Sequence, residues 1–273
     1  MSGIRSLVKQ LVPERFRMLR YSLYEKARYY PEMVVRLGNR LECPFCGWHF
    51  KRFKPAGFHY PVIIEKQVIG GHWHEDNVCP RCLSNARERL AYLYLKERTS
   101  VFQKPARLLH IAPEPQLART LKRSPNIKYV SADLFESGVM SRFDIQKTPF
   151  RDQTFDVVIC NHVMEHVPDD SVAMAEVHRI LKPGGWAMLQ VPIALALDRT
   201  IEDPTATTDE QRIERFGQED HVRLYSRADY IGRLQAAGFS VNPESYPVAL
   251  GPDKVEKFGL VEEEEVFFCS KDR

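Results

Sequence analysis

The chain has 273 residues, enough for one large domain or for a domain of about 150–200 residues with a smaller companion. Its hydrophobic content of 44% supports a buried core, and its formal net charge of +3 disfavours a protein that binds nucleic acid over its whole surface. There is no run of 18 or more apolar residues to predict a membrane span, and no export signal is visible. We therefore expect a cytoplasmic protein.

Residues 1–40 form a basic arm that carries nine Lys or Arg and three Glu, a local excess of +6. Apolar residues recur at helical spacing over 4–11 and 15–30, with Pro13 between them, which predicts two amphipathic helices flanked by cations. Two interpretations stay open. The arm either packs on its own domain, or contacts a polyanion or an anionic membrane surface, which would make the protein peripheral at the inner membrane face.

Residues 41–100 contain two C-x-x-C pairs, whose tight turns allow both sulfurs of a pair to reach one ion. In a chain without an export signal, a metal is a better interpretation of such pairs than disulfides. Four thiolates close a tetrahedral site, which is typical of structural rather than catalytic zinc. The pattern predicts a zinc-ribbon or treble-clef module with a hairpin between the pairs and a helix after Ser84. The predicted ligands are Cys43, Cys46, Cys79 and Cys82.

Three arginines, Arg81, Arg87 and Arg89, lie close to the second cysteine pair. A solvated helix face explains them most simply, and contact with a phosphate-bearing substrate is the alternative. The histidines of this module are expected on its surface or in its hairpin.

Residues 101–273 alternate between apolar strand-like runs and helical patterns, which predicts an α/β sheet covered on both faces. The clearest unit runs from 155 to 192, where a buried strand, a helix, the breaker sequence LKPGG and a second strand follow one another. Strands are predicted at 107–112, 127–132, 143–145, 155–160, 186–191, 239–241 and 266–269, and helices at 116–122, 172–181 and 226–237.

The segment DIQKTPFRDQTFDVVICNHVMEHVPD, followed by LKPGGWAMLQVP, resembles the class I S-adenosylmethionine-dependent methyltransferases of the small-molecule, type 11-like kind. The resemblance covers about residues 105–271. It implies a Rossmann-like, doubly wound sheet of the seven-stranded methyltransferase type, with S-adenosylmethionine as cofactor. Two CPxC pairs ahead of such a domain also resemble a bacterial group with an N-terminal zinc ribbon, an architecture that recurs in an rRNA guanine methyltransferase.

The resemblance implies roles for residues at the carboxyl ends of the predicted strands, where ligands of such sheets bind. Asp133 would accept hydrogen bonds from both ribose hydroxyls. Asp144 would accept from the adenine amine, while the amide of Ile145 meets the ring. Asn161 and His162 would line the floor beside the methionine moiety and the methyl group.

The turn after the first strand departs from the family, which usually has a glycine-rich loop there. Residues 110–116 read HIAPEPQ and contain no glycine, although glycine allows close backbone approach to a cofactor. Either Ala112 is small enough and Glu114 meets the ammonium group of the cofactor, or cofactor binding is lost; the other retained positions favour the first. Glu165 and His166 form an "EHV" signature whose expected task is to orient the following helix.

Residues 193–225 form a long insertion, here called the lid insertion, which in related methyltransferases covers the acceptor. Within it, His221 is the candidate general base, because an imidazole titrates near pH 7. Arg223 is the candidate for holding an anionic acceptor group. Cys160 and Cys269 are expected as small core residues.

These observations divide the chain into a helical arm (1–40), a zinc-binding module (41–100) and a methyltransferase domain (101–273). The predicted activity is methyl transfer from S-adenosylmethionine to an oxygen or nitrogen of a small molecule, a sugar or a lipid-linked glycan. The alternative is an RNA base methyltransferase that grips RNA with the zinc module. A third hypothesis is a non-catalytic scaffold that binds partners.

Overall fold

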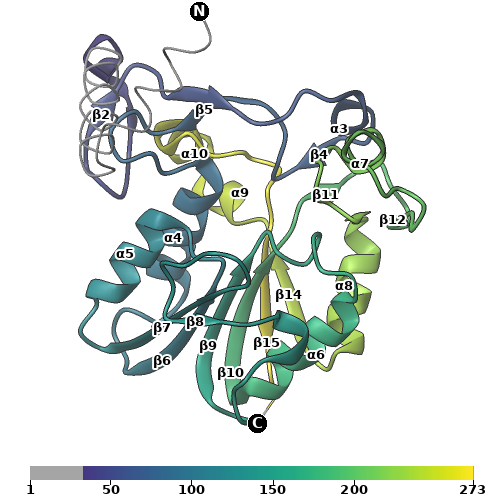
Figure 1. The fold of residues 1–273 in the computed structure, drawn as a ribbon. Coiled ribbons are helices and arrows are strands. Elements are labelled where there is room, and N and C mark those ends of the chain that lie inside the picture. The colour runs from purple at the N-terminus through teal and green to yellow at the C-terminus, as the bar shows by residue number, and fades with distance from the viewer. Residues whose placement is uncertain (1–32, 273) are drawn as a thin grey trace, which may run out of the picture.

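A computed structural model describes residues 33–272 of the chain, and its centre is a seven-stranded sheet (Figure 1). The predicted amphipathic helices at 4–11 and 15–30 lie outside the described residues. In sheet order the strands are β14 (Ser240–Glu244), β15 (Val266–Ser270), β10 (Leu181–Gln190), β9 (Phe155–Asn161), β6 (Ala106–Ile111), β7 (Ile127–Asp133) and β8 (Ser141–Arg142).

The order of the strands defines where a ligand can bind. Strands β6, β7, β8, β9 and β10 pair in parallel, whereas β15 is antiparallel to both of its neighbours, β10 and β14. From β6 the chain moves outward to β7 and β8 and then returns to β9 on the other side of β6. The carboxyl ends of β6 and β9 therefore form a topological switch point. The predicted Rossmann-like, doubly wound, seven-stranded fold is confirmed.

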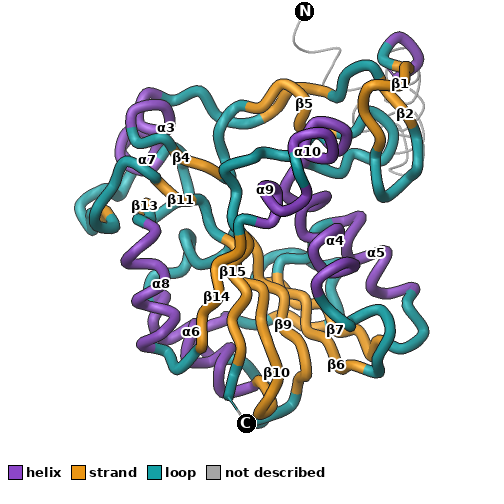
Figure 2. Tube along the Cα trace, turned by 180° about the vertical axis from the view of Figure 1, so that it is seen from behind, coloured by secondary structure: helices purple, strands orange, loops and turns teal. Residues whose placement is uncertain are grey.

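Helices cover both faces of the sheet, as Figures 1 and 2 show from opposite sides. One face packs a core that includes Leu117, Val157 and Met188, and the other packs a core that includes Val158, Met174 and Leu234. The first face is covered by α4 (Ala86–Arg98), α5 (Pro115–Arg123), α9 (Tyr246–Leu250) and α10 (Pro252–Phe258), and the second by α6 (Asp170–Ile180) and α8 (Arg227–Ala236).

Side-chain caps explain where three of these helices begin. Asn85, Asp169 and Ser226 each accept a hydrogen bond from a backbone amide in the first turn of the helix that follows. Ser226 thereby fixes the start of α8 directly after the lid insertion. Cys160 and Cys269 are buried in the core as expected.

The prediction of a strand at 143–145 is wrong in position. The strand is β8, two residues earlier, and the 3-10 turn η1 (Ile145–Lys147) follows it. The cause is Asp144, whose side chain accepts a hydrogen bond from the Gln146 amide and caps this turn. Strand β10 also begins earlier than predicted, at Leu181, and includes the LKPGG sequence.

The cysteine module lies above the carboxyl edge of the sheet. Strand β1 (Leu37–Glu42) begins inside the predicted arm and pairs with β2 (His49–Phe50), so the arm is not helical as far as residue 40. The predicted hairpin is β3 (Lys54–Ala56) paired with β5 (His74–Val78), and its connection contains α3 (Pro61–Glu65) and β4 (Val68–Ile69). Helix α4 belongs to residues 41–100 but packs in the hydrophobic core of the main sheet. The module and the sheet therefore share a core on either side of residue 100.

The lid insertion is folded and joined to the cysteine module. It contains β11 (Ile193–Ala194), β12 (Ile201–Glu202), α7 (Asp209–Phe216) and β13 (Arg223–Leu224). Strand β11 pairs with β4, and Phe216 and Leu224 share a small core with Ile63 and Val68. None of the helices in residues 33–272 is long and apolar enough to cross a membrane.

Candidate functional site

A cleft of about 580 Å³, here called the first cleft, opens at the carboxyl ends of β6, β7 and β9. This is the switch point at which α/β sheets bind ligands. Five of the seven residues predicted to bind the cofactor line it: Ala112, Asp133, Asp144, Ile145 and His162.

The two acidic residues of the first cleft are held by local hydrogen bonds. Asp133 Oδ1 accepts from the amides of Phe135 and Glu136 at 2.7 and 2.9 Å, and its Oδ2 takes part in neither bond. Asp144 accepts from the amide and the side chain of Gln146 at 2.9–3.2 Å. Each carboxylate is therefore fixed in direction before a ligand arrives.

Sequence reasoning missed the apolar part of the first cleft. Leu134 and Phe135 follow Asp133 and line the cleft, and the Phe135 side chain is 80% exposed. Two large apolar residues exposed directly after a strand-end acid are suited to stacking on a flat ring such as adenine. The sequence Asp-Leu-Phe at the end of a buried strand is the signal that could have identified them.

Glu114 and Asn161 do not line the first cleft; they form a buried network beside it. Glu114 Oε2 lies 2.6 Å from His110 Nε2, and Glu114 Oε1 accepts from Asn161 Nδ2 at 3.0 Å. Burial opposes ionisation of Glu114, but these two partners outweigh it and hold the pKa of the carboxyl below its ordinary value. Each oxygen of Glu114 already has one partner and keeps further lone pairs, so contact with the ammonium group of the cofactor stays a prediction.

The backbone is strained at the ends of both strands that flank the switch point. Ala112, after β6, has φ +47°, and His162, after β9, has φ +55°. Residues with a Cβ atom adopt this left-handed region at a cost of roughly 1–2 kcal/mol. Ala112 occupies the place where the family usually has glycine, and its left-handed φ is one that glycine adopts without a steric cost.

An Ala112→Gly substitution is expected to raise the free energy of unfolding by up to about 1 kcal/mol. Glycine relieves the backbone strain of the folded state, and this gain exceeds the free energy lost because glycine makes the unfolded chain more flexible. The matched control is Ala118→Gly inside α5, which should lower it by about 1 kcal/mol. Urea unfolding of both variants measures the difference. Equal losses in the two variants would mean that the turn at Ala112 is not strained.

A second cleft, of about 440 Å³, lies between the cysteine module and the sheet. His162, His166 and Asp220 line both clefts, so the two cavities meet at these side chains. The polar side chains of the second cleft come from the cysteine module, from the segments around the sheet and from the lid insertion: His72, His74, Asn77, Asn85, Arg87, His162, Glu165, His166, Gln218, Asp220, His221 and Glu264.

Three of these side chains form a compact cluster, here called the EHH cluster: Glu165, His166 and His221. One ligand atom from each lies within 4.8 Å of the other two. The rings of His166 and His221 meet edge to face with centroids 4.7 Å apart. Glu165 and His166 were expected only to orient a helix, and the sequence carries no sign that the lid insertion brings His221 against them.

His221 is 2% exposed, and burial lowers its pKa to about 4. The imidazole is therefore neutral at pH 7 with a lone pair available. Proton transfer is most efficient when the pKa of the base lies near the working pH, so His221 is a weak general base. A neutral imidazole is also the form that binds metal ions.

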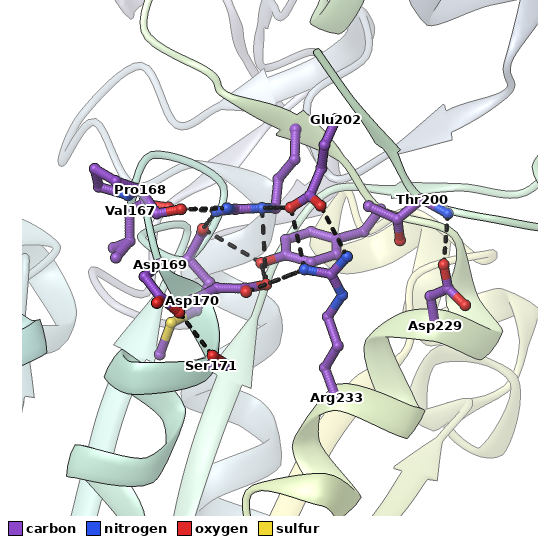
Figure 3. Close-up of polar contacts among 12 residues, drawn as sticks. Val167, Pro168, Asp169, Asp170, Ser171, Thr200, Glu202, Asp229 and Arg233 are labelled. Atoms are coloured by element: carbon purple, nitrogen blue, oxygen red, sulfur yellow. Dashed lines mark hydrogen bonds and ion pairs between the residues drawn. The ribbon is translucent and has the colours of Figure 1, made fainter. Parts of the chain in front are cut away.

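Arg223, predicted to hold an anionic acceptor, lies in neither cleft of the described chain and is 4% exposed. Its guanidinium donates to the carbonyls of Met164, Val167 and Pro168 and to Glu202. Figure 3 shows the surrounding network, in which Arg233 joins Asp170 and Glu202. Arg223 therefore anchors the lid insertion to the loop that carries Glu165 and His166, and the acceptor-binding prediction is corrected to this positioning role.

The four cysteines come together at one point, with all sulfurs within 4.8 Å of one another. The Sγ atoms of Cys43 and Cys82 are 3.5 Å apart, and those of Cys46 and Cys79 are 3.8 Å apart. A tetrahedral zinc ion with Zn–S bonds of about 2.3 Å requires separations of about 3.8 Å. The four free thiols thus fit a structural zinc ion, which would leave no open position for chemistry.

Comparison with known proteins gives a family match and several partial likenesses. A family model described as "Methyltransferase domain" matches residues 83–244. The Escherichia coli K12 uncharacterized protein YafE is 31% identical over 97 residues, 36% of this chain and 44% of that protein. A ubiquinone biosynthesis O-methyltransferase of Paraburkholderia phymatum is 29% identical over 89 residues, 31% of this chain and 36% of that protein. This chain therefore spans less than half the length of these relatives.

Two solved structures align with part of the chain. A structure of an S-adenosylmethionine-dependent methyltransferase from Mesorhizobium loti aligns with a TM-score of 0.42 and 13% identity, covering 62% of this chain and 92% of that one. The cyclase SpnF aligns with a TM-score of 0.47 and 16% identity, covering 67% of this chain and 81% of that one.

Proposed function

Because the chain belongs to the methyltransferase domain family, we propose that it transfers a methyl group from S-adenosylmethionine to an oxygen or nitrogen of a small polar acceptor. The first cleft would hold the cofactor, and the second cleft would hold the acceptor. The observation that carries the proposal is that the two clefts meet at His162, His166 and Asp220. Methyl transfer requires this kind of juxtaposition, because the acceptor atom must approach the methyl carbon in line with the breaking bond.

The cofactor is proposed to lie along the carboxyl ends of three strands. Asp133 would accept from the ribose hydroxyls, Asp144 and the Ile145 amide would meet adenine, and Leu134 and Phe135 would cover the ring. The methionine end would then reach the left-handed turns at Ala112 and His162. The sulfonium supplies the electrophile, so the protein contributes position and a route for the proton of the acceptor.

The acceptor is proposed to be small and hydrogen-bonding. The second cleft has a volume suited to a small molecule or a monosaccharide, and Arg87, Glu264 and several imidazoles line it. Burial raises the pKa of Glu264 to about 7, so this carboxyl can be present as a hydrogen-bond donor at neutral pH. Relatives named for ubiquinone and menaquinone biosynthesis are consistent with a small-molecule acceptor. A lipid-linked glycan would place only its terminal sugar in the cleft.

Isothermal titration calorimetry of the full chain with S-adenosylmethionine tests the proposal first. We expect saturable binding of one cofactor per chain, followed by formation of S-adenosylhomocysteine when a panel of phenolic, sugar and amine acceptors is added. Absence of binding at millimolar cofactor would instead favour the scaffold hypothesis.

A His221→Asn substitution is expected to lower turnover at least about tenfold, because it removes an imidazole that would position the acceptor in the second cleft. Cofactor affinity should stay within about twofold, since His221 does not line the first cleft. Turnover is measured at saturating cofactor, and affinity by calorimetry. Unchanged turnover would remove His221 from the chemistry.

A basic cavity supports RNA as a second candidate acceptor. A cleft of about 830 Å³ beside the cysteine cluster is lined by Arg81, Arg119 and Arg123. Binding of RNA there would depend steeply on salt, because each neutralised phosphate releases counterions. Filter binding of a mixed RNA at 50 and 200 mM salt separates the candidates: micromolar, salt-sensitive affinity lost in an Arg119→Glu, Arg123→Glu double variant favours RNA.

A further inference from the structure

We propose that the EHH cluster is a binding site for a divalent first-row transition metal at the junction of the two clefts, with Glu165, His166 and His221 as ligands. The inference deepens the proposed function and, as an account of catalysis, rests on it. It narrows the proposed methyl acceptor to one that binds the metal through an oxygen atom. The site is separate from the four cysteines.

The ligand atoms are already gathered to nearly the required distance. Glu165 Oε1 lies 4.0 Å from His166 Nε2, and all three ligand atoms fall within 4.8 Å of one another. Ligands at about 2.1 Å from one metal are separated by about 3.0–4.2 Å. Side-chain adjustments of less than about 1 Å would complete the coordination.

Two buried polar atoms of this cluster lack a hydrogen-bond partner among the described residues. They are Glu165 Oε2 and His221 Nδ1, and each belongs to a side chain that is 2% exposed. An unpaired buried polar atom costs roughly 1–3 kcal/mol, and a carboxylate oxygen costs more. A cation bound through Glu165 Oε2 and His221 Nδ1 would satisfy both atoms at once, while Glu165 Oε1 stays 3.4 Å from His162 Nδ1.

The surroundings hold the ligands in the orientation that coordination needs. His166 Nδ1 lies 3.2 Å from both the backbone oxygen and the carboxylate of Asp220. A proton on Nδ1 directed at these oxygens leaves the lone pair on Nε2, the nitrogen nearer Glu165, as in carboxylate–histidine–metal arrangements. The Val222 amide donates to the Glu165 carbonyl, and Arg223 holds the Met164 carbonyl, so the lid insertion fixes the loop.

Two imidazoles and one carboxylate select the class of metal. This donor set suits zinc, iron(II) or manganese(II), whereas magnesium prefers oxygen ligands alone. Three protein ligands leave open positions on the metal for the acceptor or water. The cluster is thus suited to binding and polarising a ligand, unlike the closed four-cysteine site.

The metal supplies a way for an oxygen acceptor to lose its proton. A hydroxyl bound to a divalent cation becomes more acidic, and its proton passes to water. The acceptor oxygen then forms a bond to the methyl carbon. The carbon–sulfur bond breaks with its electron pair moving to sulfur, which leaves S-adenosylhomocysteine. An acceptor with a hydroxyl beside a second oxygen would occupy two of the open positions.

Manganese(II) uptake by the full chain tests the site directly, and electron paramagnetic resonance measures it. The chain is first loaded with one equivalent of zinc per chain, which the four thiolates take up in preference to the EHH cluster, and manganese binds such soft ligands too weakly to displace it. We expect one manganese ion per chain, with affinity reduced more than about tenfold by Glu165→Gln and by His221→Asn. The matched control His72→Gln, in the same cleft but outside the cluster, should bind as the unaltered chain does. Melting temperatures confirm that each variant is folded.

The outcomes separate this site from the proposed function. No saturable manganese uptake by the unaltered chain, or uptake that survives both ligand substitutions, overturns the metal site. Calorimetry with S-adenosylmethionine on the same samples is independent: cofactor binding without manganese uptake leaves the methyltransferase proposal standing. Manganese uptake without cofactor binding leaves the metal site standing and removes its proposed role in methyl transfer.

Discussion

An Arg89→Leu substitution is expected to lower the free energy of unfolding by at least about 3 kcal/mol, one of the largest single-residue effects in this chain. Arg89 is completely buried, and its guanidinium donates to five backbone carbonyls: those of Asp76, Asn77, Ser84, Phe258 and Gly259. Each buried carbonyl left without a donor costs roughly 1–3 kcal/mol. Removing the guanidinium also removes the cost of burying its charge, but this gain offsets only part of the loss in the free energy of unfolding.

The five carbonyls come from segments that are far apart in sequence, so Arg89 ties β5, the second cysteine pair and the end of α10 to helix α4. Burial lowers the pKa of Arg89 to about 10, and the side chain remains charged at neutral pH. The sequence suggested a solvated helix face or a phosphate contact, and both interpretations are wrong for this residue. Its position nevertheless matters for function, because β5 forms one wall of the second cleft.

Urea unfolding measures the effect, and Arg98→Leu in the same helix is the control. Arg98 makes an ion pair with Glu244 near the surface, which is worth about 0–1 kcal/mol. An Arg89→Lys variant should lose nearly as much stability as Arg89→Leu, because an ammonium has three donors and no planar fork. Equal stability of the Arg89 and Arg98 variants would contradict the bridging role.

Replacing Asp133 with Asn is expected to raise the dissociation constant for S-adenosylmethionine about 10- to 100-fold. A hydrogen bond to a charged acceptor contributes about 1.5–3 kcal/mol, and the substitution removes the charge and one acceptor oxygen facing the ribose hydroxyls. Asn keeps an oxygen that can accept from the amides of Phe135 and Glu136, so the turn should survive. The melting temperature is therefore expected to change little.

Calorimetry gives the affinity of the Asp133→Asn variant, and Asp152→Asn serves as the matched control. Asp152 is an exposed partner of Arg179 and does not line the first cleft. Its loss should leave cofactor affinity unchanged. An Asp133→Asn variant that binds the cofactor as tightly as the unaltered chain would remove Asp133 from the cofactor site.

Much of the fold could be predicted because its signals are local. The apolar run from Phe155 to Cys160 is buried on both faces of the sheet as β9, and the spacing of the helix after it reappears as α6. The cysteine pairs predict their own convergence, since four sulfurs need one ion. The strand at 143–145 was misplaced because a single side-chain cap, that of Asp144, decides between a strand and a turn.

The predicted residues that line the first cleft lie at strand ends or within three residues beyond them. Asp133 is the last residue of β7 and His162 directly follows β9, and the sheet topology brings them together. Arg223 was assigned to a ligand because a charged residue in a loop has no visible partner in the sequence; the fold gives it buried carbonyl partners instead. The second cleft depends on the pairing of β4 with β11, between residues more than a hundred positions apart, which no local pattern encodes.

The most direct test of the whole account is a crystal structure of the chain with S-adenosylhomocysteine. We expect its adenine against Leu134 and Phe135, its ribose on Asp133, and its sulfur at the junction formed by His162, His166 and Asp220, facing the second cleft. A nucleoside bound in any other cavity, or one whose sulfur points away from the second cleft, would contradict the assignment of donor and acceptor sites.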